Sequence, residues 1–479
     1  MKKTLKHTLI VAIIIINVFG LVACQTSAPV DYLADYQVID NLSVRMPAEY
    51  EECSMIMMCY PNMMTIDAYK TIAEDNKILL LVNYGLDEDD NLVSRIDEAK
   101  QIFVEAGVNM ENVTFLDMDI DWDYTYWARD FSPFYVFNDY ELSIVDFTYN
   151  RPQRVGQNVV PEQLAEYFDI PYYMMDIVHT GGNLMQDGRG TAFSDDLVIT
   201  ENDRDWDKVL GAMEEYTGTE NYVITIDPQG DYIAHIDCWA KIVAPDKIIV
   251  ASLPKTDERY LYYETVAFIL GNTQCAYGYN YRIYRVEEPG GDIVAPYTNS
   301  LIANNRVYMP LGEDEEYNKK ALAVYQEALP GYEIIGIKCP DFVYDEYYDE
   351  WYNGFLNTDA LHCRTHEVPC KNMLFIDSRN VYHGIVPKLE AYVVKTNIVS
   401  YSQSEVNEED VVIYYSINNG DYQKCNMSRY KDTTNFTYVF TNLKSGDDVR
   451  YYIEAKDSSG HNAMDPYCGV NDPHHFTVE

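Results

Sequence analysis

The chain has 479 residues, and its 77 acidic residues against 35 basic ones give a formal net charge of −42. A charge this negative argues against nucleic acids and anionic membrane surfaces as partners, and it would attract cationic peptides. Ten cysteines over this length are too few for a disulfide scaffold, and the sequence has no CxxC pair that would indicate a zinc ribbon. The length predicts a globular protein of more than one domain.

The N-terminal segment has the pattern of a targeting signal. Residues 1–7 are basic, residues 9–19 form a short apolar run, and Leu21-Val-Ala-Cys24 resembles the cleavage site of a bacterial lipoprotein. We therefore expect a signal peptide over 1–24, with Cys24 acylated, and a linker over 25–46. An ordinary secretory signal is the alternative. Either reading predicts export, and the first predicts attachment to the cell envelope or cell surface through the lipid anchor alone.

Residues 47–388 repeat one pattern, in which an amphipathic helix is followed by a short strand. The repeat predicts helices over 92–106, 161–168, 204–217, 257–270 and 314–329, and strands over 113–117, 172–176, 222–226, 281–285 and 332–336. We expect Asn91 to cap the first helix and Gly107 to end it. This alternation is typical of an α/β fold.

Each strand of the repeat is followed by a polar residue that could serve a common site. The first four units then continue as hairpins with polar turns, and the fifth continues into a single strand over 373–377. The turns are at 138–139, 187–190, 245–247 and 304–306. One such unit cannot bury its apolar faces alone, whereas five arranged about an axis can. A generic α/β domain with evenly spaced loops is the alternative.

Beyond residue 389 the pattern changes to strands alone. Expected strands over 411–416, 436–440 and 449–455, with turns at 418–420 and 457–460, predict an immunoglobulin-like β-sandwich over 389–479. Whether Cys425 and Cys468 in this segment form a bridge is left open. The apolar surroundings of the remaining cysteines predict buried thiols that act as small hydrophobes, namely Cys53, Cys59, Cys238, Cys275 and Cys339.

Cys363 is the candidate nucleophile. Its chain neighbours His362, Arg364 and His366 could supply positive charge, which favours the thiolate over the thiol. A thiolate that is paired with a histidine, here His235, suits covalent attack on an electrophilic carbon.

Asp130 and Asp237 indicate the charge of the electrophile. Each carboxylate can accept two N–H bonds from a guanidinium group, so the pair predicts a cationic substrate. A thiol, a histidine and two aspartates together point to a guanidine-modifying enzyme.

Five motifs resemble those of the bacterial family that contains the Porphyromonas-type peptidylarginine deiminases and the agmatine deiminases. They are Trp127-Ala-Arg-Asp130, His179-Thr-Gly-Gly-Asn183, His235-Ile-Asp237, Tyr297-Thr-Asn-Ser300 and the segment from Ala360 to Pro369. The likeness covers roughly 47–388. It implies the pentein fold, a five-bladed α/β propeller, and hydrolysis of a guanidinium to a ureido group with release of ammonia.

The resemblance also implies a role for each site residue. Asp130 and Asp237 would hold the guanidinium while Cys363 attacks its carbon. His235 would protonate the departing ammonia and then deprotonate the water that hydrolyses the thiouronium intermediate. Asn299 matches the family's catalytic asparagine and would position the thiol or the intermediate. No metal or organic cofactor is expected.

Several features favour a peptide substrate over free agmatine. Thr180 stands where agmatine-cleaving relatives typically have a glutamate, and the export signal and the β-sandwich fit an extracellular peptide. Arg151 and Arg154 could clamp a C-terminal carboxylate, although surface arginines neutralised by the acidic background are the alternative. Trp127 would stack on the substrate's aliphatic stem or line the pocket, and His179 is expected to support the site more than to contact substrate.

The predicted function is therefore that of an exported deiminase acting on arginine in peptides, with C-terminal arginine favoured. An agmatine or free-arginine deiminase is the first alternative. A papain-like protease fits poorly, because Cys363 follows His235 in the chain and lacks that family's flanking motif. An inactive surface protein that keeps the pentein scaffold for binding is the non-enzymatic alternative.

Overall fold

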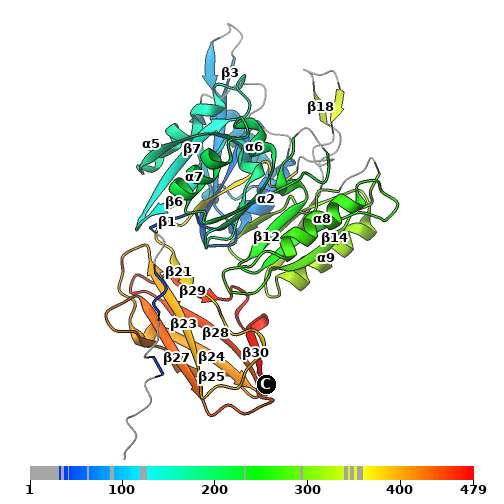
Figure 1. Cartoon of the computed structure of the whole chain (residues 1–479). Coiled ribbons are helices and arrows are strands. Elements are labelled where there is room, and N and C mark those ends of the chain that lie inside the picture. Colours follow the sequence, from blue (N-terminus) through cyan, green and yellow to red (C-terminus); the bar gives the residue numbers. More distant parts are fainter. Residues whose placement is uncertain are drawn as a thin grey trace, which may run out of the picture.

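The structure is a computed structural model with an α/β region and an all-β region that ends at the C-terminus (Figure 1). It describes residues 32–33, 37–40, 43–61, 64–86, 91–118, 127–230, 233–291, 295–338, 343–345, 350–352 and 360–479. The expected signal peptide, Cys24 and Cys339 lie outside these residues. None of the helices within them is long and apolar enough to cross a membrane.

Four sheets of the α/β region share one order of elements: a hairpin, a helix, and a strand parallel to the second hairpin strand. The helical crossover is what permits the parallel pairing. The elements are β6 (Phe134–Asn138), β7 (Glu141–Tyr149), α5 (Val160–Phe168) and β8 (Tyr172–His179); β9 (Met185–Gln186), β10 (Thr191–Asp195), α6 (Leu197–Glu201), α7 (Trp206–Thr217) and β11 (Asn221–Thr225); β12 (Ala240–Ala244), β13 (Lys247–Ser252), α8 (Tyr260–Gly271) and β14 (Arg282–Glu287); and β15 (Leu301–Ala303), β16 (Arg306–Leu311), α9 (Glu315–Ala328) and β17 (Glu333–Lys338).

These elements confirm four of the expected helices, their following strands and all four hairpin turns, although α6 was not expected. The start of α9 illustrates the local cause. The Asp314 carboxylate accepts the backbone N–H groups of Glu316 and Tyr317 at 2.8 and 3.3 Å, and so satisfies donors that the first turn of a helix leaves without partners. A small antiparallel pair, β18 (Val343–Asp345) with β19 (Glu350–Tyr352), follows β17.

A fifth sheet joins the start of the α/β region to its end. Its strands are β20 (His366–Pro369), β2 (Cys53–Tyr60), β3 (Ile78–Leu86), β4 (Leu92–Ser94) and β5 (Val113–Met118), with helices α2 (Ile66–Asp75) and α3 (Ile96–Ala106). β20 runs antiparallel to β2, and β2, β3 and β5 are parallel. The segment that carries Cys363 is thereby anchored directly to the first long strand.

The first expected helix, 92–106, is partly wrong. Residues 92–94 form β4, which pairs antiparallel with the end of β3, and α3 starts only at Ile96 after Arg95. Asn91 therefore does not cap it, whereas Gly107 ends it in the left-handed conformation, as expected. Apolar spacing over three residues cannot distinguish a helical turn from a short strand. The helix α2 was not expected either.

The expected domain boundary at residue 389 is also wrong. β21 (Leu374–Asp377) pairs with β23 (Ala391–Ser400), and β22 (Gly384–Val386) pairs with β30 (His474–Val478). The strand over 373–377, assigned above to the fifth α/β unit, thus belongs to the all-β region. Strand character can be read from the sequence here, but the pairing partner cannot.

The all-β region consists of two sheets around one apolar core. Their orders are β21-β23-β27-β26 and β22-β30-β28-β24-β25, with β29 beside β28. The further strands are β24 (Val411–Ile417), β25 (Gln423–Asn426), β26 (Ser428–Arg429), β27 (Asn435–Thr441), β28 (Asp448–Lys456) and β29 (Asn462–Asp465). Side chains from both sheets, among them Tyr392, Phe436, Ile453 and Phe476, share the core.

The cysteines are free thiols throughout the described residues. Cys425 and Cys468 are therefore not bridged to each other, which settles the pairing that the sequence left open. The burial expected of Cys53, Cys59, Cys238 and Cys275 is confirmed.

The expected linker over 25–46 is wrong in its described part. β1 (Val44–Arg45) pairs antiparallel with β6, and the backbone of Ile39 exchanges hydrogen bonds of 2.7 and 3.0 Å with the side chain of Asn435. Of the described residues before 47, Ile39 thus contacts the all-β region and β1 belongs to a sheet of the α/β region.

Ion pairs, some of them buried, join the two regions. Arg189 is fully buried, donates to the Ile376 carbonyl at 3.0 Å and lies 3.5 Å from the Asp465 carboxylate. Lys247 and Arg282 of the α/β region both contact Asp472, at 2.7 and 2.8 Å.

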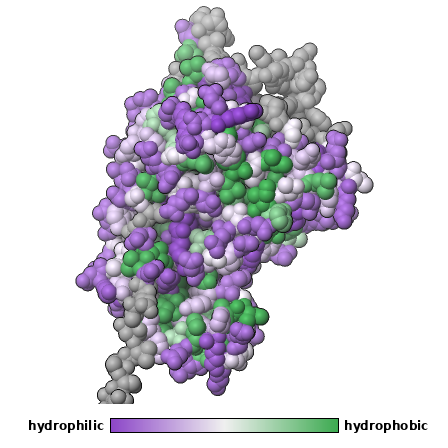
Figure 2. Space-filling model, in the orientation of Figure 1, coloured by the Kyte–Doolittle hydropathy of each residue, from purple (hydrophilic) through white to green (hydrophobic). Residues whose placement is uncertain are grey.

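Figure 2 shows hydrophilic residues over most of one face, as the net charge of −42 requires, with smaller hydrophobic patches between them.

Candidate active site

The structure brings the predicted catalytic residues to short turns that immediately precede strands or hairpins. Asp130 lies in the one-turn helix α4 (Ala128–Phe131), and Asp237 lies in the 3₁₀ turn Ile236–Cys238, directly after His235. Asn299 precedes β15, and Cys363 precedes β20. All five residues are buried, with at most 7% of the surface of any one residue exposed. Their burial means that charges placed here interact strongly.

Asn299 holds the Cys363 thiol through two contacts. Its amide nitrogen donates to the Cys363 sulfur at 3.2 Å, and its amide oxygen accepts the Cys363 backbone N–H at 3.1 Å. The carboxylate of Asp237 lies 3.7 Å from the same sulfur. The Cys363 carbonyl accepts the backbone N–H of Arg129, which ties the thiol segment to the helix that carries Asp130. The asparagine is thus placed for the positioning role expected of it.

The imidazole ring of His235 lies beside the carboxylate of Asp130. Its Nδ1 atom is 3.6 Å from Asp130 Oδ1, and its Nε2 atom has no hydrogen-bond partner among the described residues. Burial, with repulsion from Arg151 and His179, lowers the pKa of His235 to about 3. The imidazole is therefore neutral near pH 7 and can accept a proton on Nε2.

The Gly-Gly turn at 181–182 is required by close packing at this point. A Cβ atom on Gly182 would lie 2.5 Å from His235 Nδ1 and 2.8 Å from Asp130 Oδ1. A Cβ atom on Gly181 would lie 2.0 Å from the Arg129 carbonyl oxygen. Only glycines let this turn approach Asp130 and His235 so closely.

The loop after β7 brings Arg151 and Arg154 to the same site. The Arg154 guanidinium lies over the Trp127 ring, 4.5 Å from its centroid, and donates to the Tyr149 hydroxyl at 3.3 Å. Arg151 is near enough to depress the pKa of His235. Trp127, three residues before Asp130, is thus covered by a cation on one side, as a pocket-wall residue would be.

His179 is held within the sheet of β6, β7 and β8. Its ring packs against Phe134 and Phe147, its Nε2 lies 3.2 Å from the Tyr222 hydroxyl, and its Nδ1 accepts the Thr180 backbone N–H at 2.8 Å. Burial lowers its pKa to about 4. Both ring nitrogens are engaged by the protein, which fits a supporting residue better than a substrate ligand.

The cationic neighbourhood expected around Cys363 is only partly present. Burial, with repulsion from Arg129, lowers the pKa of His366 to about 4, so this histidine is neutral near pH 7. The guanidinium of Arg129 lies nearby, with its Nε 3.5 Å from the His362 carbonyl oxygen, and is paired with Glu367 at 2.7 Å. Chain adjacency could not show that His366 is neutral, because it does not reveal burial or cations from other segments.

His362 is the functional residue that the sequence reading missed. Its Nδ1 lies 2.6 Å from Asp237 Oδ2, the oxygen that faces Cys363, and its Nε2 lies 3.0 Å from Glu49 Oε2. Glu49 also contacts the Lys241 ammonium group. Both histidine contacts are hydrogen bonds only when Asp237, His362 and Glu49 together carry two protons. The adjacency of His362 to Cys363 was the only sequence signal available for this chain of contacts.

Two further features bear on ligands. A cavity of about 50 Å³, large enough for one or two water molecules, adjoins the buried charges of Glu49, Arg129, Lys241 and Glu367. Asp237, Cys238 and Cys363 also place three ligand-type atoms within 4.8 Å of one another. A soft metal ion bound there would occupy the nucleophile, so it would inhibit covalent chemistry at Cys363.

Comparison with known proteins identifies the family. Residues 45–369 match the family model described as Porphyromonas-type peptidyl-arginine deiminase. A protein of Legionella pneumophila (strain Philadelphia 1), assigned as an agmatine deiminase, is 25% identical over 349 residues, which cover 68% of this chain and 91% of that protein.

Solved structures share the fold of the α/β region. The agmatine deiminase of Enterococcus faecalis is 18% identical with a TM-score of 0.56 over 70% of this chain and 99% of that one. The agmatine deiminase of C. jejuni is 19% identical with a TM-score of 0.53 over 70% of this chain and 98% of that one. Because the family match covers well over half of its length, the chain belongs to the Porphyromonas-type peptidyl-arginine deiminase family, whose members are deiminases, hydrolases that act on the C–N bonds of amidines.

Proposed function

We propose that the protein is an exported peptidylarginine deiminase that converts arginine, chiefly C-terminal arginine of peptides, to citrulline and ammonia. The observation that carries the deiminase chemistry is the buried group of Cys363, Asn299, Asp237, Asp130 and His235. The group combines a nucleophile, a neutral base and two carboxylates for a planar cation. No further group is needed for the two hydrolytic steps.

In the first step the substrate guanidinium lies between Asp130 and Asp237, each of which can accept N–H bonds from it. The neutral His235 takes the thiol proton, and the Cys363 sulfur forms a bond to the guanidinium carbon. His235 returns that proton to one amino nitrogen, the C–N bond breaks, and ammonia leaves. A cationic thiouronium intermediate remains on Cys363, held by the Asn299 amide at the sulfur.

In the second step His235, neutral again, takes a proton from water while the oxygen attacks the thiouronium carbon. The C–S bond breaks, the thiolate recovers the proton from His235, and the remaining hydroxyl proton of the attacking water is released to solvent. The product is a neutral ureido group. Because this product carries no charge, the two carboxylates hold it less strongly than the guanidinium, which favours release.

Three features support peptides as substrates. The Arg151–Arg154 loop lies beside Trp127 and within electrostatic reach of His235, and its guanidinium groups are suited to pair with the α-carboxylate of a C-terminal arginine. Thr180 stands where agmatine-cleaving relatives typically have a glutamate, and the N-terminal sequence has the pattern of a lipoprotein signal peptide. We propose the envelope or cell surface as its location, through Cys24, and peptides or proteins as its partners.

We also propose a finer architecture. The five α/β sheets, with β20 of the chain's end paired to β2 of its start, fit a five-bladed pentein propeller. The two facing sheets after β20 fit an immunoglobulin-like sandwich.

A specific observation favours one alternative, an agmatine or free-arginine deiminase, because the Legionella relative is assigned as an agmatine deiminase. The carboxylate clamp separates the two readings, since agmatine has no carboxylate. An inactive binding protein is the non-enzymatic alternative. The catalytic group is complete in this chain, which weighs against it.

A citrulline and ammonia assay over a guanidine panel tests the proposal. The panel contains a peptide ending in arginine, its C-terminal amide, a peptide with internal arginine, free arginine and agmatine, with a Cys363→Ala variant as the blank. The highest kcat/KM is expected for the free-acid peptide. Preference for agmatine would establish the first alternative, and no turnover of any of the five would favour the binding protein.

A further inference from the structure

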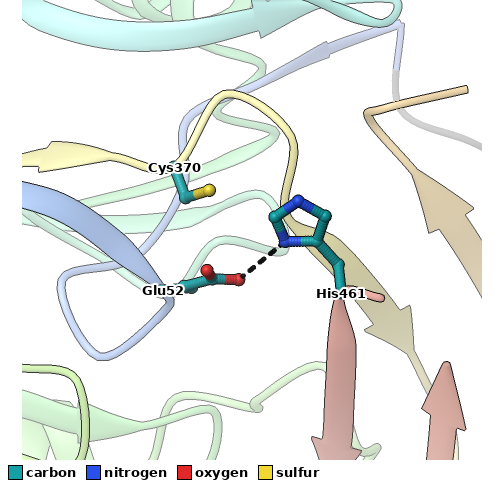
Figure 3. Close-up of side chains that lie close together, drawn as sticks. All are labelled: Glu52, Cys370 and His461. Atoms are coloured by element: carbon teal, nitrogen blue, oxygen red, sulfur yellow. Dashed lines mark ion pairs between the residues drawn. The ribbon is translucent and has the colours of Figure 1, made fainter. Parts of the chain in front are cut away.

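Three side chains of metal-ligand type meet where the α/β region contacts the all-β region (Figure 3). Glu52 precedes β2, Cys370 follows β20, and His461 lies in the turn between β28 and β29. A carboxylate oxygen, the thiol sulfur and a ring nitrogen of these residues lie within 4.8 Å of one another. The cluster is separate from the active site, because Cys363 precedes β20 and Cys370 follows it.

The backbone around all three residues is held in place by hydrogen bonds. The Cys370 N–H donates to the Glu52 carbonyl at 2.9 Å, so these two residues are fixed side by side. The turn that carries His461 is fixed by Asp457, whose Oδ1 accepts the His461 backbone N–H at 3.0 Å. The same oxygen accepts the Ser459 and Gly460 N–H groups. A site on such a frame is preorganised and loses little entropy when a ligand binds.

The spacing of the side chains fits a shared ion better than a direct bond. His461 Nδ1 lies 3.6 Å from Glu52 Oε2, the contact drawn as a dashed line in Figure 3, which is too long for a hydrogen bond. Zinc binds nitrogen at about 2.0–2.1 Å and oxygen at about 2.0–2.2 Å, so a nitrogen and an oxygen ligand on one tetrahedral ion lie about 3.3–3.5 Å apart. The Glu52–His461 distance of 3.6 Å is close to this spacing.

The chemistry of the three donors narrows the class of ion. One thiolate, one imidazole and one carboxylate are ligands that zinc and similar transition metals accept. Calcium and magnesium prefer sets made of oxygen alone. Glu52 and His461 also border an open cavity of about 360 Å³ between the two regions, so solvent can reach the site and complete a tetrahedral set.

We propose that Glu52, Cys370 and His461 bind one divalent transition-metal ion of the zinc class, with a water molecule as the fourth ligand. The Cys370 thiol loses its proton to solvent when the ion binds, because the thiolate is the ligand form. The ion links the start of β2 and the end of β20 to the β28–β29 turn. It therefore strengthens the attachment of the all-β region to the strand that follows Cys363, which goes beyond the proposed deiminase function.

Metal titration of the full chain tests this site. The chain carries Cys363→Ser, so that the Asp237, Cys238 and Cys363 cluster lacks its nucleophilic thiol as a competing ligand. Zn²⁺ is followed by calorimetry and by thermal unfolding, and Co²⁺ by the thiolate-to-cobalt absorption band. The expected result is one ion per chain, a cobalt–thiolate band and a Tm that rises with Zn²⁺.

Second-site variants in the same background identify the ligands. Cys370→Ser should remove the cobalt–thiolate band and the rise in Tm, and His461→Gln should weaken binding at least about tenfold, the scale on which lost metal-site contacts act. Cys275→Ser, a buried thiol elsewhere, is the matched control and should bind as the parent does. A parent that binds no ion, or a His461→Gln variant that binds Zn²⁺ as the parent does, would overturn the proposal. The latter outcome remains decisive if Cys370→Ser does not fold.

One measurement separates this site from the catalytic one. With Cys363 intact, Cys370→Ser should keep parental deiminase activity at temperatures well below its Tm. Equal loss of activity and metal binding would instead assign the ion to the active site.

Discussion

The contact between His362 and Asp237 leads to the sharpest prediction about catalysis. His362 Nδ1 lies 2.6 Å from the Asp237 oxygen that faces the Cys363 sulfur, and both side chains are at most 3% exposed. A hydrogen bond to a buried charged group contributes about 1.5–3 kcal/mol. If this bond orients Asp237 toward the guanidinium, its loss in His362→Ala should lower kcat/KM by about 10- to 150-fold.

Two further variants separate the contacts of the ring. The side-chain nitrogen of an asparagine lies near the position of Nδ1, and that of a glutamine near the position of Nε2. His362→Asn should therefore keep the donor to Asp237 and retain most activity. His362→Gln should keep only the contact with Glu49, which lies 3.0 Å from Nε2, and should resemble the alanine variant.

The assay is citrulline formation from a peptide ending in arginine, with Tm recorded for each variant. His366→Asn is the matched control, because His366 lies on the same segment and its Nδ1 donates to the Glu367 carbonyl, outside the contacts of Asp237. A higher kcat/KM for His362→Gln than for His362→Asn would refute the positioning role. Alanine activity within threefold of the parent would do the same.

Further expectations follow from the other side chains. Cys363→Ala should abolish citrulline formation while the Tm stays close to the parental value, and activity within tenfold of the parent would remove the covalent mechanism. Asp130→Asn should cost about 2–5 kcal/mol of transition-state stabilisation, read as kcat/KM, because the buried guanidinium loses an ionic partner; a near-parental value would contradict the clamp. Arg151→Ala should lower kcat/KM for a free-acid peptide about tenfold or more and leave its amide unaffected, and an equal effect on both would exclude the carboxylate contact. The free energy of unfolding should decrease from pH 7 to pH 5 in the parent, and His179→Gln should make this decrease smaller. Burial lowers the pKa of His179 to about 4. The stability that the neutral ring contributes is therefore complete above the unfolded pKa of about 6.5, and about 2 kcal/mol of it is lost by pH 5. If the free energy of urea unfolding changes equally between pH 7 and pH 5 in parent and variant, this ring is not responsible.

The fold was predictable where local pattern and tertiary structure agree. The helices α5, α7, α8 and α9 and their hairpins have regular apolar spacing and clear turn residues, such as Asp314 at the start of α9. The errors concern short strands. β4 is a three-residue strand beside the nearby end of β3, whereas β20 and β22 pair with strands far away in the chain, as β20 does with β2 across more than 300 residues. Pairing at that range leaves no trace in apolar spacing.

The same limit applies to the site, with a different consequence for each residue. The motifs pointed to the candidate site residues, because each of these residues stands in a segment that resembles a motif of the family. They are Cys363, Asp237, Asn299, His235 and Asp130. The electrostatics could not be read in this way. Whether a histidine is neutral depends on its burial and on the charges that surround it. Burial, together with cations from other segments, lowers the pKa of both His235 and His366.

Glu49 shows why the supporting residues are the hardest to find. It precedes β2, yet its carboxylate accepts the Ile302 N–H at 2.7 Å and contacts His362 and Lys241, which come from three other parts of the chain. Its position depends on the closure of the fifth sheet, in which β2 takes up β20 just after Cys363. The pairing that sequence pattern could not reveal is therefore the one that fixes the carboxylate behind His362. The orientation of Asp237 against the thiol depends, through His362, on contacts that exist only once the two ends of the α/β region have joined.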